Sequence, residues 1–130
     1  METNVVKKKS VQFALRIIKL SKYLKAKKRE FVISKQILRS GTSIGANITE
    51  AQCGQSKKDF YAKMYIAYKE ATETSYWLYL LYRSGYINSV EYDSMIKDNI
   101  ELIKLLTAIT KSQKLQLSNK TSNQQPQNNC

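Results

Sequence analysis

The stretch that decides the fold is Arg39-Ser40-Gly41-Thr42-Ser43-Ile44-Gly45-Ala46-Asn47-Ile48-Thr49-Glu50-Ala51. Apolar or small residues recur in and beside it at steps of three and four, the spacing of one helix face: Ile37, Gly41, Ile44, Ile48 and Ala51. A small polar set recurs at the same steps, about 100° further round the helix: Ser40, Ser43, Asn47 and Glu50. An ordinary surface helix needs only one packing face. We therefore predict a helix that packs its apolar face on the core and its polar face on a neighbouring helix or subunit.

Gly41 and Gly45 lie inside this predicted helix, where each costs about 1 kcal/mol relative to alanine. Close approach of a neighbouring backbone would explain both glycines. The alternative is a loop over residues 41–45 that binds phosphate through its N–H groups. The spacing matches neither the Walker A nor the dinucleotide-binding pattern, which favours the helix.

Helical periodicity continues through most of the chain. We predict helices over about residues 10–25, 31–53, 57–84 and 90–111. The predicted fold class is all-α, an antiparallel up-down-up-down four-helix bundle with short connections. We divide the chain into a basic N-terminal arm over residues 1–9, the bundle over 10–114 and a disordered polar tail over 115–130.

The same periodicity predicts the core. In the first helix the apolar stripe is Val11, Ala14, Leu15 and Ile18. In the third it is Phe60, Met64, Ala67, Ala71, Leu78 and Tyr82. In the fourth it is Met95, Ile96, Asn99, Leu102, Ile103, Leu106, Ile109 and Thr110. Cys53 is predicted to be a small buried residue.

The composition excludes several kinds of chemistry. The chain contains no histidine, which removes the usual general base near neutral pH and the commonest metal ligand. Ser-His and Cys-His pairs and a Cys/His zinc site are therefore impossible. We expect no enzyme activity, no catalytic residues, no metal site and no cofactor.

The sequence also bears on location. It contains no stretch of about 18 apolar residues, so we predict no transmembrane helix. The basic N-terminus is not followed by an apolar signal core, because Arg16 and Lys19 interrupt it. We expect a cytoplasmic protein with no membrane partner.

The formal net charge of +12 is concentrated at one end. Residues 1–40 hold 12 Lys and Arg against Glu2 and Glu30, a balance of +10. This indicates an anionic partner, RNA or DNA in preference to a membrane surface, whereas the alternative is a solvated face. The candidate nucleic-acid-binding residues are Lys7, Lys8, Lys9, Arg16, Lys19, Lys22, Lys25, Lys27, Lys28 and Arg29. Arg39 is a further candidate that could instead pair with Glu50 or a neighbour.

A row of tyrosines follows one edge of the predicted third helix: Tyr61, Tyr65, Tyr68, Tyr76, Tyr79 and Tyr86. Tyrosine is enriched at protein interfaces, so the row predicts a subunit contact or a flank of the core. Base stacking is a weaker alternative, because basic residues do not interleave closely with the row. The candidate oligomer-interface residues are Ser40, Ser43, Asn47, Glu50, Tyr61, Tyr65, Tyr68, Tyr76 and Tyr79.

These residues resemble a known family. The pattern Gln36-Ile37-Leu38-Arg39-Ser40-x-x-Ser43-Ile44-x-Ala46-Asn47-Ile48-x-Glu50-Ala51 is similar to that of the 23S ribosomal RNA intervening-sequence proteins. Further support comes from Phe60, Tyr61, Ala67, Glu70, Glu73 and Gly85-Tyr86-Ile87. The chain departs from the family at Gly45, where Pro is common, and at Ala51, where Gly is common. It also lacks the usual Pro before Glu30.

The resemblance implies a four-helix bundle that assembles into a ring-like homopentamer. It also implies a link to RNA, because family members are encoded in sequences that interrupt bacterial 23S rRNA genes. A related branch serves diversity-generating retroelements as an accessory factor that engages nucleic acid and a reverse transcriptase. We therefore expect a non-enzymatic, oligomeric nucleic-acid-binding protein. The alternatives are a scaffold that binds a partner protein such as a reverse transcriptase and, last, a membrane-surface binder.

Overall fold

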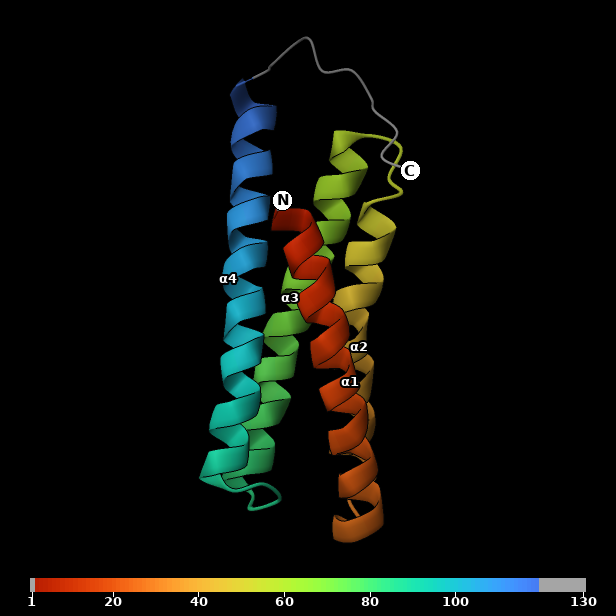
Figure 1. Cartoon of the computed structure of the whole chain (residues 1–130), viewed down its shortest axis with the longest axis vertical. Coiled ribbons are helices and arrows are strands. Elements are labelled where there is room, and N and C mark those ends of the chain that lie inside the picture. Colours follow the sequence, from red (N-terminus) through yellow and green to blue (C-terminus); the bar gives the residue numbers. More distant parts are fainter. Residues whose placement is uncertain (1, 120–130) are drawn as a thin grey trace.

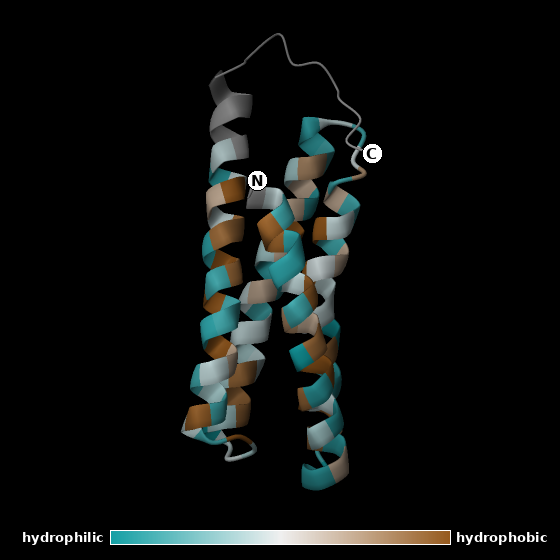
Figure 2. Cartoon of the chain, viewed as in Figure 1, coloured by the Kyte–Doolittle hydropathy of each residue, from teal (hydrophilic) through white to brown (hydrophobic). Residues whose placement is uncertain are grey.

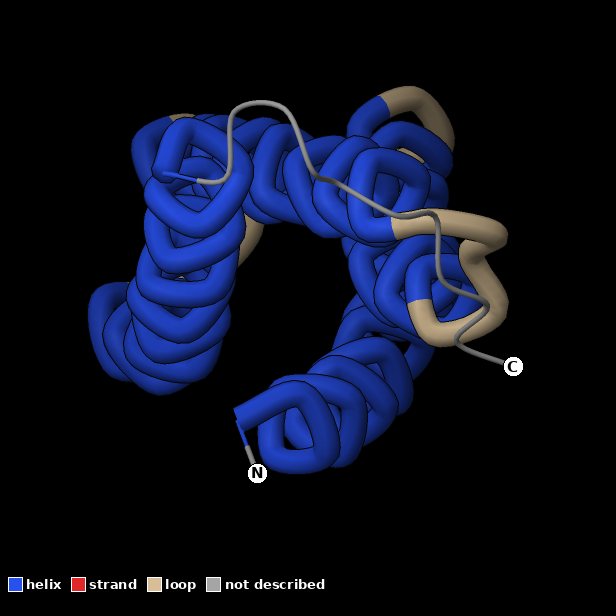
Figure 3. The backbone as a smooth tube through the Cα atoms, turned by 90° about the horizontal axis from the view of Figure 1, so that it is seen from above, coloured by secondary structure: helices blue, strands red, loops and turns tan. Residues whose placement is uncertain are grey.

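Four helices account for nearly the whole chain in the computed structural model, which describes residues 2–119 and the side chains of residues 3–112. They are α1 (Glu2–Lys28), α2 (Ile33–Ala51), α3 (Lys57–Arg83) and α4 (Ser89–Asn119). Successive helices run in opposite directions and pack side by side (Figure 1). α1 also lies beside α4, and this is the most open side of the bundle from above (Figure 3). For the described residues, the predicted all-α four-helix bundle is confirmed.

The element boundaries differ from the prediction mainly at the two ends. Residues 2–9, predicted as an arm, form the first turns of α1, because Val6 and Ser10 are buried against the bundle. α4 continues to Asn119, past the predicted start of the tail at residue 115. Residue 1 and the rest of the predicted tail, residues 120–130, lie outside the described residues.

The core lies between the four helices. The predicted apolar face of α2 is confirmed, since Ile37, Ile44, Ile48 and Ala51 are fully buried. The predicted faces of α3 and α4 are confirmed in the main, although Tyr82, Ile96 and Ile103 are only half-buried. Figure 2 shows hydrophobic and hydrophilic residues alternating along each helix, as expected when one face of each helix is buried.

The predicted core stripe of α1 is wrong. Val11 and Leu15 are 49% and 57% exposed, and the helix instead buries the row Val6, Ser10, Phe13, Ile17, Ser21 and Leu24. Two serines interrupt the apolar pattern of this row, so that hydrophobic periodicity favoured the other side of the helix. Serines suit the buried side because their small side chains let α1 and α2 approach closely.

The two glycines of α2 face α1 at the point of close approach. A Cβ atom on Gly41 would lie 2.8 Å from Cγ1 and Cγ2 of Ile17, and one on Gly45 would lie 3.0 Å from the Ser10 hydroxyl. Further along, the Ser21 hydroxyl donates a hydrogen bond to the Ser34 carbonyl of α2 at 3.3 Å. Close approach of a neighbouring helix at both glycines is confirmed, although the nearest atoms belong to side chains of α1 and not to its backbone. The phosphate-loop alternative is wrong because residues 41–45 are helical.

The connection between α1 and α2 is organised by Glu30, which is only 8% exposed. Its carboxylate accepts hydrogen bonds from the backbone N–H groups of Val32, Ile33 and Ser34 at 3.2, 3.1 and 2.7 Å. These donors belong to the start of α2, where no helical partner exists for them. Glu30 therefore caps α2 from outside the helix, and Arg29 before it has a left-handed backbone with φ of 55°.

The other two connections also contain helix caps. The Ser56 hydroxyl accepts a hydrogen bond from Asp59 N–H and starts α3. Asn88 and Glu91 exchange side-chain and backbone hydrogen bonds of 2.8 Å, a capping box that starts α4. Gly85 follows α3 with φ of 85°, a conformation that favours glycine after a helix. Cys53, predicted to be buried, is exposed in the turn after α2.

We predict that Gly41→Ala destabilises the fold, although alanine is the better helix former. The new Cβ would meet the buried, β-branched Ile17, and overpacking of this kind costs about 1–3 kcal/mol. Chemical denaturation of the single variants and of Gly41→Ala with Ile17→Ala measures the coupling. The loss caused by Gly41→Ala should be smaller in the Ile17→Ala background, and an equal loss in both backgrounds would contradict the contact.

We also predict that Glu30→Ala lowers the free energy of unfolding by about 1–2 kcal/mol, because it leaves the first N–H groups of α2 without an acceptor. Asp93→Ala is the control, since Asp93 is an exposed carboxylate near the start of α4. Thermal and chemical denaturation of both variants test the difference. A loss for Asp93→Ala as large as that for Glu30→Ala would argue against the capping role.

Candidate nucleic-acid interface

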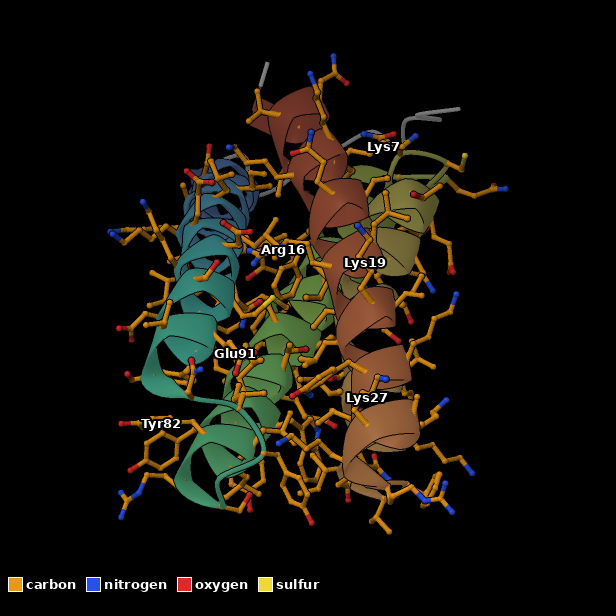
Figure 4. The ribbon with its side chains drawn as sticks, turned by 60° about the horizontal axis from the view of Figure 1, so that its bottom comes forward. Lys7, Arg16, Lys19, Lys27, Tyr82 and Glu91 are labelled. Atoms are coloured by element: carbon orange, nitrogen blue, oxygen red, sulfur yellow. The ribbon has the colours of Figure 1, made fainter. Side chains whose placement is uncertain are left out.

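Two of the predicted nucleic-acid-binding residues of α1 are instead tied to α4. Lys9 forms an ion pair of 2.9 Å with Glu101, and Arg16 forms one of 2.5 Å with Asp98. Arg16 also donates a hydrogen bond to the Ser94 hydroxyl at 2.8 Å. Figure 4 shows Arg16 between the two helices. The row of basic residues read from the sequence is thus divided, and these two cations connect α1 to α4.

Arg39 is likewise engaged within the chain. Its guanidinium pairs with Glu70 at 3.3 Å and with Glu73, both on α3. The predicted alternative partner, Glu50, pairs with Lys63 of α3 at 2.9 Å. Arg39 therefore joins α2 to α3, and we remove it from the candidate interface.

Six exposed cations lie where α1 connects to α2. We call Lys22, Lys25, Lys27, Lys28, Arg29 and Lys35 the basic pole. All six are exposed, and within the described part of the chain none forms an ion pair. Lys27 lies near the far end of α1 in Figure 4. Lys35 was not among the sequence candidates, because it belongs to the next helix and only the turn brings it to the same end.

The carboxylate nearest to the basic pole in sequence, that of Glu30, is directed at the start of α2 and not at the cations. Glu30 is buried, and its oxygens accept the three N–H groups at the start of α2. A helix N-terminus carries partial positive charge, which the Glu30 carboxylate offsets. Among the described side chains, Glu30 therefore forms no ion pair with the cations around it, which stay available to an external anion.

The other candidates lie along α1. Lys8 and Lys19 are exposed and Lys7 is half-buried, and no ion pair of these residues is found among the described side chains. They are spread along the helix, as Lys7 and Lys19 show in Figure 4. This arrangement continues the positive charge of the basic pole toward the N-terminus.

The polar row of α2, predicted to contact a neighbouring helix or subunit, makes its hydrogen bonds within the chain. Ser40 is fully buried and accepts a hydrogen bond from the Thr74 hydroxyl of α3 at 2.9 Å, so its assignment to an oligomer interface is wrong. Ser43 and Asn47 donate hydrogen bonds to carbonyls one turn earlier in α2. The neighbour of this face is therefore α3.

The tyrosine row of α3 is partly exposed and is interleaved with cations. Tyr65, Tyr76 and Tyr79 are 47%, 56% and 45% exposed, whereas Tyr61, Tyr68 and Tyr86 are half-buried. The Lys69 ammonium lies 6.0 Å from the centre of the Tyr65 ring, and the Arg83 guanidinium lies 5.6 Å from that of Tyr79. The sequence argument that basic residues do not interleave with this row is therefore wrong.

Aromatic contacts fix the orientation of several of these rings. Tyr65 stacks on Tyr68 with ring centres 5.8 Å apart, and Tyr79 meets Tyr92 edge to face at 6.4 Å. Burial, together with the nearby Tyr79, Asp93 and Tyr82, raises the pKa of Tyr92 above its usual 10. The Tyr92 hydroxyl therefore stays protonated at physiological pH, and this corner of the surface gains no negative charge from it.

A groove of about 480 Å³ lies between α1 and the start of α4. Its lining is mainly apolar, with Leu20 and Tyr23 on one side and Val90 and Met95 on the other. Val90 is 75% exposed. Charged groups of both signs stand at the groove, Arg16 and Lys19 from α1 and Glu91 from α4. The groove was not predictable from the sequence, because it depends on how α1 and the start of α4 lie relative to each other.

The described residues contain neither a membrane-spanning helix nor a cluster of metal ligands. Within residues 2–119, no helix is long and apolar enough to cross a membrane. Over the same described part, no group of three or more cysteine, aspartate or glutamate side chains is placed to hold a metal ion.

Comparison with known proteins places the chain in a family. A family model described as 23S rRNA-intervening sequence protein matches residues 2–108. The chain is similar to a crystal structure of a protein with unknown function from the S23 ribosomal protein family of Bacteroides thetaiotaomicron VPI-5482. The identity is 57% and the TM-score 0.84, over 85% of this chain and 99% of that chain. No curated protein matches the chain. The chain therefore belongs to the 23S rRNA-intervening sequence protein family.

Proposed function

We propose that this protein is a non-enzymatic, oligomeric nucleic-acid-binding protein that contacts phosphates through the basic pole. The observation that carries this proposal is the gathering of six exposed cations where α1 meets α2. Glu30, the acidic residue within this segment, is buried and occupied by the start of α2. Such a surface is complementary to a polyanion.

The mechanism we propose is electrostatic positioning. Lys and Arg that neutralise phosphates release condensed counterions, which gives affinity that falls with salt concentration. Contacts of this kind orient a nucleic acid but carry no direct information about its sequence. The family description refers to 23S rRNA, which supports structured RNA as the first ligand to test.

We also infer that the protein self-associates through the groove between α1 and α4. The groove presents Tyr23 and the highly exposed Val90 to solvent, and burying apolar side chains of this kind favours association. Lys19 and Glu91 on opposite sides give the groove charges of both signs. A second copy of this chain presents the same lysine and glutamate and can therefore pair with both charges, whereas a partner of uniform charge can pair with only one of them.

The basic pole can be tested by removing its charge. We predict that Lys25→Ala, Lys27→Ala and Lys28→Ala together weaken binding to a 23S rRNA fragment or duplex DNA at least about tenfold near 100 mM salt. The slope of log affinity against log salt should fall by about 2–3, the value for three lost phosphate contacts. Fluorescence anisotropy across a salt series measures both quantities.

The matched control removes the same charge elsewhere. Lys97→Ala, Lys104→Ala and Lys111→Ala change the net charge equally, and all three lysines are exposed on α4. They should leave the slope nearly unchanged. Equal losses for the two triple variants would show that only net charge matters, and no binding by the unaltered protein at low salt would overturn the proposed function.

Self-association has its own test. Val90→Asp places a charge in the groove, while aspartate in the first turn of α4 suits the helix dipole and preserves folding. We expect light scattering to show a smaller mass for this variant than for the unaltered protein. Val32→Asp is the control, because Val32 is 72% exposed before α2 and lies outside the groove lining. A monomeric unaltered protein, or equal masses for all three proteins, would refute the inference.

A further inference from the structure

We propose that the exposed edge of α3 is a stacking platform for single-stranded nucleic acid. The platform consists of Tyr65, Lys69, Tyr76, Tyr79 and Arg83, which follow one another at steps of three, four or seven residues and so share one face of the helix. The proposal rests on the proposed function for its ligand class, but it concerns a different surface and a different kind of contact.

The side chains of the platform combine rings with cations. Tyr65, Tyr76 and Tyr79 each expose roughly half of their surface. Lys69 lies over the ring of Tyr65 and Arg83 over that of Tyr79, while no cation is found over the ring of Tyr76 among the described side chains. Arg83 also donates a hydrogen bond to the Tyr79 hydroxyl at 2.6 Å, which holds it against that ring. Bases can stack on such rings while the cations meet the phosphates between them.

The charge of the platform favours an anionic partner over a second protein surface of mixed charge. The five platform residues include two cations and no carboxylate. Glu73 lies at the margin of the same face, four residues after Lys69 and three before Tyr76, and it lines a depression with Lys69 and Glu70. The two glutamates of this part of α3, Glu70 and Glu73, are paired with Arg39 of α2. Glu73 also accepts a hydrogen bond from Trp77 Nε1 at 2.9 Å.

The dimensions of the platform suit an extended strand more than a duplex. At 1.5 Å per residue, Tyr65 and Tyr76 are about 17 Å apart along the helix and Tyr76 and Tyr79 about 5 Å. Bases in a duplex are stacked on one another and cannot reach these rings, whereas the bases of a single strand can. α1 and α3 end at the same end of the bundle, so a strand bound at the basic pole can continue toward Arg83 (Figure 1).

The experiment compares a labelled oligouridylate of about 12 nucleotides with an RNA duplex of the same length, by fluorescence anisotropy near 50 mM salt. Tyr76→Leu keeps an apolar side chain at an exposed position but removes the ring. We expect it to weaken binding of the oligouridylate at least about fivefold, the lower end of the effect of one stacked base, with little change for the duplex. Tyr76→Phe keeps the ring and should bind like the unaltered protein.

Trp77 gives a second, local readout. It is the only tryptophan of the chain, and its ring centre lies 5.0 Å from that of Tyr76. Stacking of a base on Tyr76 should therefore change the tryptophan emission when the oligouridylate is added, and the duplex should not. Tyr76→Leu should abolish the change, and Tyr76→Phe should retain it.

The outcomes separate this proposal from the proposed function. Equal affinity of Tyr76→Leu and the unaltered protein for the oligouridylate overturns the platform, while loss of duplex binding in the basic-pole variant would still support the pole. If Tyr76→Leu weakens binding of the oligouridylate while the basic-pole triple variant binds RNA like the unaltered protein, the platform is supported and the pole is overturned. A smaller mass of Tyr76→Leu by light scattering identifies the surface as a subunit contact and overturns the platform. Absence of binding to either RNA overturns both proposals.

Discussion

The close approach of α1 to α2 is the constraint on which the rest of the structure depends. Gly41 admits the side chain of Ile17, and Gly45 admits the Ser10 hydroxyl. A Cβ atom at Gly41 would overlap the buried Ile17 side chain and require the packing to shift, and one at Gly45 would press closely on the Ser10 hydroxyl, because protein interiors are closely packed. The contact selects which side of α1 is buried, since only the side with Ser10, Ile17 and Ser21 fits against the glycines.

The side of α1 that is buried determines which of its residues reach the surface. With the serine-containing side of α1 buried, Val11 and Leu15 turn outward, while Lys9 and Arg16 come within reach of the carboxylates of α4. Most of the cations of α1 that stay exposed lie beyond the α4 contacts, near the turn to α2, whereas Lys8 and Lys19 are exposed further along the helix. The positive field of the protein is therefore shaped by the packing of α1 as well as by the number of lysines.

Burial also determines which charges count. Glu30 and Glu73 both lie near exposed cations in sequence or space, yet each carboxylate is occupied, Glu30 by backbone N–H groups and Glu73 by Arg39 and Trp77. Formal charge counted along the sequence treats such carboxylates as free counter-charges. The carboxylates keep their charge, but the fold holds them against α2 and Arg39, so within the part of the chain that the structure describes neither forms an ion pair with the cations of the basic pole or of the α3 edge.

The sequence by itself determined the helical fold class and the buried face of α2, because helical periodicity is a local property and Ile37, Ile44 and Ile48 follow it without interruption. It also predicted both glycines as points of close approach and the basic segment that became the pole. Periodicity predicted the wrong buried side of α1, because two sides of that helix have a comparable apolar pattern. The side with the serines is buried, since packing against the glycines of α2 depends on shape more than on hydrophobicity. Only the tertiary structure decided the partners of Lys9, Arg16 and Arg39, the placement of Lys35 at the pole and the cations beside the tyrosines. Each of these depends on which residues of different helices, or of different turns, come within a few ångströms of one another.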